Sequence, residues 1–213
     1  LRFRESLPAT RRSNAGWGQL LHGFGAVLHN RPFVGYILQL GFAQGVLFGN
    51  IASSPFIVQE HYGFSAFGFS LCFAANSLAI MSAAALAVRF RRQERATLLG
   101  CRGMLLFSLA TAAALACHCG FWLYEMLVFA LLFSMGITFP ATTTLAMDCT
   151  REHAGTASAL LGAVCFAFGG LVSPLVGMGD TLLSTGTVFV VCAVGSWLAF
   201  RSALHHRNRL AVA

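Results

Sequence analysis

The chain has 213 residues, of which 57% are hydrophobic and 10% are charged, and its mean hydropathy is +0.72. Because soluble domains carry about 25% charged residues, this composition excludes an ordinary soluble domain and predicts a membrane protein. The net charge of +7 comes from 14 basic residues that are all arginines, and their places at the ends of apolar runs argue against a nucleic-acid surface, which would gather them on one soluble face.

The first 32 residues are predicted to form a cytoplasmic lead-in and not a secretion signal, because no apolar core directly follows the basic sequence LRFRESLPATRR. Since the chain begins with Leu1 and not with Met, we expect a piece of a longer protein, or a chain whose start is missing. Apolar residues then recur at three- and four-residue spacing, which predicts an amphipathic helix in the membrane interface. These residues are Trp17, Leu20, Leu21, Phe24, Val27 and Leu28.

Six apolar runs follow, and each holds at least the ~20 residues that a helix needs to cross a hydrocarbon core of ~30 Å. None alternates as a strand would, and only closed barrels satisfy strands in lipid, so we predict an all-α membrane protein with six transmembrane helices. The first and fourth runs are long, and we expect Pro55 and Pro140 to kink them. The spans are predicted over residues 33–58, 65–88, 97–116, 121–147, 155–178 and 181–200, with a cytoplasmic tail over 201–213.

The arginines predict the orientation of these spans. They lie before the first span, between the second and third, just inside the third, between the fourth and fifth, and after the sixth, whereas the other three connections contain no Arg or Lys. Positive charge in alternate short loops marks the cytoplasmic side of a membrane. We therefore expect a multi-pass membrane protein with both ends of this chain in the cytoplasm.

Small residues recur every fourth position along two of the predicted spans. Such stripes let two helix backbones approach closely, so we expect them to serve helix packing and not ligand binding. The residues of these stripes are Gly41, Gly45, Gly49 and Ser53 in the first span, and Gly169, Ser173 and Gly177 in the fifth.

Side-chain amides occur in only the first two spans, as Gln39, Gln44, Asn50 and Asn76. An amide in hydrocarbon is costly unless it faces protein or water, so these spans are predicted to border a polar cavity or a partner helix. The third and sixth spans carry no amide or carboxylate and are predicted to face lipid. For Gln44 and Asn76, a hydrogen bond between helices remains an alternative to a place in the cavity.

Glu125 is the only carboxylate well inside a span, and it lies beside Trp122 and Tyr124, which suit the aromatic belt of an interface. Two roles remain open for it, a group that simply reaches outer water and a proton or cation site. Phenylalanines are expected to supply apolar walls to the cavity. The candidate substrate-binding residues are Gln44, Asn50, Asn76, Glu125, Phe48, Phe73 and Phe166.

Enzyme chemistry is not expected. No predicted span contains a histidine for a serine nucleophile, no two aspartates lie inside spans, and no HExxH motif occurs. The seven cysteines are scattered, and Cys117-His118-Cys119 offers only three of the four ligands of a structural zinc site, so we predict a short outer turn there. We expect no metal and no cofactor.

Several segments resemble the C-terminal half of a major facilitator superfamily drug exporter of the Bcr/CflA type, the bicyclomycin and chloramphenicol resistance family. The resemblance covers almost the whole chain and is most specific over residues 154–177. The matching segments are ESLP at 5–8 with Arg11 and Arg12, like the linker after the family's sixth helix; HNRPFVGYILQLGFAQGVLFGNIASSPFIVQEHYGFS at 29–65, like the seventh helix and its outer loop; SLCFAANSL at 70–78, like the eighth; and AGTASALLGAVCFAFGGLVSPLVG at 154–177, like the eleventh.

The resemblance implies proton-coupled export of amphipathic drugs by alternating access, in a twelve-helix fold whose halves each contain two inverted three-helix repeats. In such transporters the first, second, fourth and fifth helices of each half border the cavity. The proton-coupling acidic residue associated with the family belongs to the first half, which is absent, and RFRRQERAT at 89–97 matches the family's glycine- and arginine-rich loop only in basic character.

The partners implied by the resemblance are a small-molecule drug, protons, the lipid bilayer and the missing N-terminal six-helix half. Two alternatives remain open. The first is a facilitator for a small metabolite, although a polar substrate would favour more fixed charge at mid-membrane than this chain offers. The second is a non-transporting six-helix membrane fragment.

Overall fold

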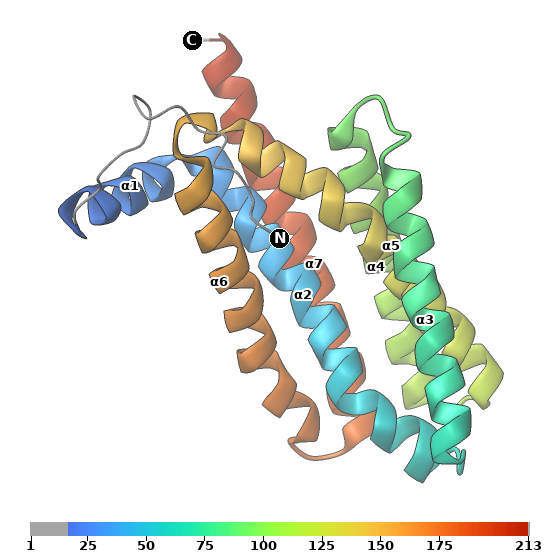
Figure 1. Cartoon of the computed structure of the whole chain (residues 1–213). Coiled ribbons are helices and arrows are strands. Elements are labelled where there is room, and N and C mark those ends of the chain that lie inside the picture. The colour runs from blue at the N-terminus through green and yellow to red at the C-terminus, as the bar shows by residue number, and fades with distance from the viewer. Residues whose placement is uncertain (1–16, 213) are drawn as a thin grey trace, which may run out of the picture.

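The computed structural model describes residues 17–212, whose regular structure is entirely helical (Figure 1). Six of these helices are long and apolar enough to cross a membrane, which confirms the predicted all-α class with six membrane helices. The linker-like motif at residues 5–12 lies outside the described residues. The helices are α1 (Trp17–His29), α2 (Arg31–Pro55), α3 (Ala66–Ala87), α4 (Gln93–Ala116), α5 (Phe121–Asp148), α6 (Ala154–Val172) and α7 (Thr181–Val212), with a π-helical segment η2 (Phe56–His61) and 3-10 segments η3 (Arg151–His153) and η4 (Ser173–Gly177).

A helix, α1, occupies the position of the predicted amphipathic helix and, in Figure 1, projects sideways from the start of α2 past α6. Of its described side chains, Val27 is buried in a cluster that includes Ala157 of α6, and Leu28 is exposed. The side chains of residues 17–22 are outside the described part of the chain. A location of α1 in the membrane interface stays a prediction.

The two ends of α2 follow from its sequence. It begins at Arg31 because the Asn30 Oδ1 accepts a hydrogen bond from the Phe33 N–H at 3.2 Å, and because Pro32 fits the first helical turn. At the other end Pro55 has no N–H to donate, and the chain continues as the wider π-helical segment η2. In contrast, α5 runs through Pro140 as one α-helix.

The packing of the six long helices is symmetric between the two halves of the chain. Helix α2 packs on α6 and α7, α5 packs on α3 and α4, and the contacts α2–α5 and α4–α7 join these groups. Exchanging α2 with α5, α3 with α6 and α4 with α7 reproduces the same contacts. Burial follows the same pairing, since the buried share of the apolar window is 67% in α2 and 56% in α5, but 17% in α3 and 22% in α6. Two inverted three-helix repeats have this arrangement.

The small residues of α2 lie against α6 and α7. A Cβ atom on Gly41 would lie 2.7 Å from the Phe168 ring, and one on Gly45 would lie 2.8 Å from the Cys192 Sγ. From the other side, a Cβ atom on Gly169 of α6 would lie 2.5 Å from the Phe48 ring. Because only glycine leaves room for such close approach, these positions bring the three helices together.

The remaining members of the two stripes differ from one another. Gly49 faces Val188 of α7, and Ser53 is buried. The Ser173 hydroxyl donates to the Gly169 carbonyl at 2.8 Å. Gly177 departs from the expected packing role, because it is exposed in η4 and no atom lies within 4 Å of the place of a Cβ.

The start of α2, the α3–α4 and α5–α6 connections and the end of α7 all lie at one end of the bundle, at the top of Figure 1, which we call the basic end. There Arg207 of α7 forms an ion pair with Glu94 of α4. The opposite end carries the acidic residues Glu60 and Asp180 in its connections. The predicted alternation of arginines thus places the described arginines toward one end of the bundle, whereas acidic residues occur at both ends, with Asp148 and Glu152 at the α5–α6 connection.

Candidate functional site

A hydrogen bond between two polar residues of different helices forms the centre of the candidate site. The Asn76 Nδ2 of α3 donates to the Glu125 Oε1 of α5 at 2.9 Å, although 49 positions separate the two residues. Asn76 is 7% exposed and Glu125 is half-buried. Glu125 is therefore engaged with a neighbouring helix and does not lie free in outer water.

Further polar groups surround this pair without hydrogen-bond partners among the described residues. They include the Asn50 Oδ1 and the Ser54 hydroxyl of α2 and the Tyr124 hydroxyl of α5. The Asn76 Oδ1 of α3, on the same amide that donates to Glu125, is also without a partner in the described part of the chain. Asn50 is 2% exposed and Tyr124 is 1% exposed. Buried polar groups are normally bonded, so a concentration of unbonded ones marks this place as chemically unusual.

These groups line one small cavity between α2, α3 and α5. Its volume is about 10 Å³, which is close to the minimum of ~10–15 Å³ that one water molecule needs. Drug-sized ligands occupy pockets of roughly 300–1,000 Å³. The polar cluster, defined as Asn50, Ser54, Asn76, Tyr124 and Glu125, can therefore hold a proton or a water molecule but not a drug.

Three of the predicted cavity residues lie elsewhere, on another side of α2. Six residues separate Gln44 from Asn50, and at 3.6 residues per turn this is a rotation of about 240° around the helix. The Phe48 ring lies one turn beyond Gln44 and contacts the Phe166 ring of α6 edge-on, with 6.0 Å between ring centroids. Phe166 is 69% exposed. We call Gln44, Phe48 and Phe166 the aromatic patch.

Phe73 belongs to the neighbourhood of the polar cluster, because it lines the same small cavity and is partly exposed. The structure thus brings Asn50, Asn76, Glu125 and Phe73 together. Phe48 and Phe166 form a second group, and Gln44 lies one helical turn from Phe48 on α2. One continuous cavity lined by all seven residues is not present in this six-helix bundle.

Gln39, the remaining amide of α2, joins helices and does not face a cavity. It is fully buried, and its Nε2 donates to the Ser196 hydroxyl of α7 at 3.0 Å. Such bonds between membrane helices are a known form of interhelical glue. They also show that one face of α7, expected from the sequence to be lipid-facing, is buried against α2.

Sequence reasoning missed two members of the polar cluster. Ser54 follows Asn50 by four residues, so helical periodicity alone places both on the same side of α2. Tyr124 was expected in the aromatic belt of the interface; in the structure its ring is buried within the bundle and lies 5.7 Å from the Tyr62 ring, centroid to centroid. No local signal distinguishes such a tyrosine from an interface tyrosine.

Comparison with known proteins points to a family. The family model described as "Major Facilitator Superfamily" matches residues 2–174. A protein of Bacillus subtilis (strain 168) with the name "Uncharacterized MFS-type transporter YdgK" is 34% identical over 204 residues. This match covers 94% of the present chain and 51% of the relative, so the chain spans about half the length of this curated relative.

Proposed function

Because the chain belongs to the major facilitator superfamily, we propose that it is the C-terminal six-helix half of a proton-coupled multidrug efflux transporter of the Bcr/CflA type. This antiporter exports amphipathic drugs across the bacterial inner membrane and so confers antibiotic resistance. Both ends of this chain lie in the cytoplasm. The bundle rocks against an N-terminal six-helix half, and the drug binds between the two halves.

Two observations support the assignment to one half of a transporter. The chain has about half the length of its Bacillus subtilis relative, and its six long helices pack as one pair of inverted repeats. A twelve-helix transporter of this family contains two such pairs. The gathering of the described arginines toward the basic end supports the cytoplasmic placement of that end.

The single observation that carries proton coupling is the Asn76–Glu125 hydrogen bond inside the membrane-spanning region. Carboxyl groups at membrane depth are costly and usually mark proton or ion pathways. In the proposed step, the Glu125 carboxylate takes up one proton from the outer side and becomes neutral. When the bundle opens inward, the group releases that proton, and the Asn76 N–H stabilises the carboxylate that remains.

The aromatic patch supports the choice of an amphipathic substrate. It offers an exposed ring, Phe166, and, one helical turn from Phe48 on α2, the partly buried amide of Gln44, whose Oε1 is buried and has no hydrogen-bond partner among the described residues. Small-molecule sites are mostly apolar and contain a few polar groups that orient the ligand. In this proposal the drug contacts the aromatic patch, and the proton binds one helix away in the polar cluster.

Substitution of Glu125 in the full-length transporter tests the coupling proposal. We expect Glu125→Gln to abolish drug-driven proton flux in proteoliposomes while drug binding to the purified protein persists. The matched control is Glu60→Gln, which makes the same chemical change at an exposed carboxylate of η2, outside the polar cluster, and should leave flux unchanged. Normal proton-coupled transport by Glu125→Gln would refute the role of this carboxyl group.

Thiol labelling tests the placement of the drug site. In a cysteine-free background, we expect Gln44→Cys to react with a membrane-impermeant thiol reagent, because an aqueous cavity would border this side of α2. Val191→Cys on α7 is exposed in the bundle, but it should stay unlabelled because that surface would face lipid. Equal labelling of the two cysteines would contradict the cavity assignment.

A further inference from the structure

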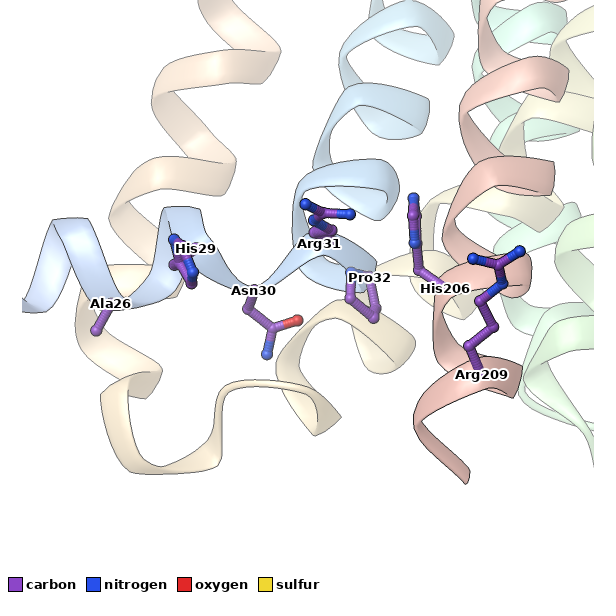
Figure 2. Close-up of a pocket in the computed structure, with 7 residues that line it drawn as sticks. All are labelled: Ala26, His29, Asn30, Arg31, Pro32, His206 and Arg209. Carbon is purple, nitrogen blue, oxygen red and sulfur yellow. The ribbon is translucent and has the colours of Figure 1, made fainter. Parts of the chain in front are cut away.

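A pocket at the basic end is lined by basic side chains from three helices (Figure 2). Its volume is about 550 Å³. His29 comes from the end of α1, Arg31 from the start of α2, and His206 and Arg209 from the end of α7. Asn30, which connects α1 to α2, also lines the pocket. We call this the basic pocket.

The positive charge of the basic pocket is not compensated within the described part of the chain. No carboxylate lines the pocket. Arg31 and Arg209 form no ion pair with a described residue, whereas Arg207, two positions before Arg209, is paired with Glu94. Two uncompensated guanidinium groups on one pocket favour an anionic ligand, because guanidinium binds phosphate and carboxylate oxygens through paired hydrogen bonds.

Specific contacts fix the position of the segment between α1 and α2 that lines the basic pocket. The Asn30 side chain caps α2 through the Phe33 N–H, and its Nδ2 donates to the Cys149 carbonyl at 2.9 Å. Val27 anchors α1 in the bundle, and Pro32 is buried. The elements that carry His29 and Arg31 are therefore fixed relative to the end of α5.

The position of the pocket indicates the source of the anion. It lies at the basic end, where α1 meets the start of α2 beside the end of α7. Ala26 and Pro32 line the pocket together with the basic residues, and Leu28, which precedes His29 in α1, is exposed, so apolar groups accompany the basic ones. A phospholipid offers both complements, a phosphate for the arginines and acyl chains for the apolar groups.

We propose that the basic pocket binds the phosphate group of an anionic phospholipid. The ligand fixes α1 and the ends of α2 and α7 to the membrane surface. This inference does not depend on the transported substrate or on proton coupling. The α3–α4 connection at the same end also forms a hollow, of about 890 Å³, that is lined by arginines. These arginines all come from one short segment, and no second helix of the described chain contributes a basic group, so this hollow provides the comparison surface.

Binding of phosphatidylglycerol to the full 213-residue chain in detergent, counted by native mass spectrometry, tests the proposal. With ~1 kcal/mol for each arginine near an anionic surface, the double substitution Arg31→Gln/Arg209→Gln should weaken binding about thirtyfold. The control Arg89→Gln/Arg91→Gln removes the same charge and should have little effect. Equal losses in the two variants would show diffuse attraction and overturn the pocket.

Two further measurements keep the result decisive. If the double variant loses helix content by circular dichroism, Arg209→Gln alone should weaken binding about fivefold, and unchanged binding would overturn the proposal. Inorganic phosphate at millimolar concentration should neither displace the lipid nor raise the melting temperature. Arginine-dependent stabilisation by inorganic phosphate would assign the pocket to a soluble anion and overturn the lipid assignment.

Discussion

The α3–α5 and α2–α6 interfaces occupy equivalent places in the two repeats but differ in chemistry. At the α3–α5 interface the Asn76–Glu125 hydrogen bond joins the helices, and Gly136 lies against the backbone of α3 at Ile80. At the α2–α6 interface the contacts are aromatic, with Gly169 against the Phe48 ring. Each interface uses a glycine for close approach, but one glycine faces backbone and the other a side chain.

This difference shows that the repeats share their packing but not the chemistry of their interfaces. Small residues and apolar surfaces set the helix contacts, and these requirements are the same on both sides of the pseudo-symmetry axis. A buried polar group is costly without a partner, so a paired amide and carboxyl at one interface can change independently of the other. In the proposed function, the two interfaces divide proton binding from drug binding.

Replacement of Gly136 should give the largest effect, because the conflict involves backbone. A Cβ atom there would lie 2.7 Å from the Ile80 carbonyl oxygen, so α3 must move away from α5. We expect Gly136→Ala to lower the free energy of unfolding by about 3 kcal/mol, near the upper end for overpacked cores. Unfolding with SDS from a mild detergent, followed by circular dichroism, measures it. Gly162→Ala on α6, where no atom lies within 4 Å, is the control and should not destabilise.

The equivalent substitution at the α2–α6 interface should cost less. In Gly169→Ala the new methyl group meets the Phe48 ring, whose partner Phe166 is exposed and can move with it. We expect a loss of about 1–2 kcal/mol in the same unfolding measurement. A loss as large as that of Gly136→Ala would mean that both interfaces are equally rigid and would remove the mechanical part of the comparison.

A double-mutant cycle isolates the polar part of the comparison. We expect a coupling free energy of about 1 kcal/mol between Asn76→Ala and Glu125→Ala, each of which removes one partner of the bond, within the range measured for hydrogen bonds between membrane helices. The four proteins of the cycle are compared by SDS unfolding at one pH. A coupling near zero would mean that the Asn76–Glu125 contact does not stabilise the α3–α5 interface.

The ion pair between Arg207 and Glu94 should contribute least. It lies at the α4–α7 contact, one of the two contacts that join the two groups of helices. Both side chains are more than one-third exposed, so water and salt screen the attraction. We expect Glu94→Gln to lower the free energy of unfolding by about 0.5 kcal/mol at low salt. The difference in unfolding free energy should disappear in 1 M salt, because the Debye length there is only ~3 Å and exposed charges are screened. A difference that persists would indicate packing and not charge.

Much of the fold was predictable, because hydropathy and arginine placement depend on local composition. The exact ends of the helices were not predictable in the same way. For example, α2 begins at Arg31 because of the Asn30 cap, and the chain continues beyond Pro55 in a π-helical segment. The site was predictable only as a set of unusual residues. Helical periodicity separates Gln44 from Asn50, but the Asn76–Glu125 contact depends on the packing of α3 on α5, which one sequence does not reveal.

The exchange of partners between the repeats has a consequence for biogenesis. The first helix of the bundle, α2, packs mainly on the last two, and its Gln39 bonds to Ser196, 157 positions later in the chain. During synthesis this amide therefore enters the bilayer long before its partner leaves the ribosome. Until the last helix is inserted, we expect the translocon or a chaperone to keep the Gln39 amide of α2 out of contact with lipid.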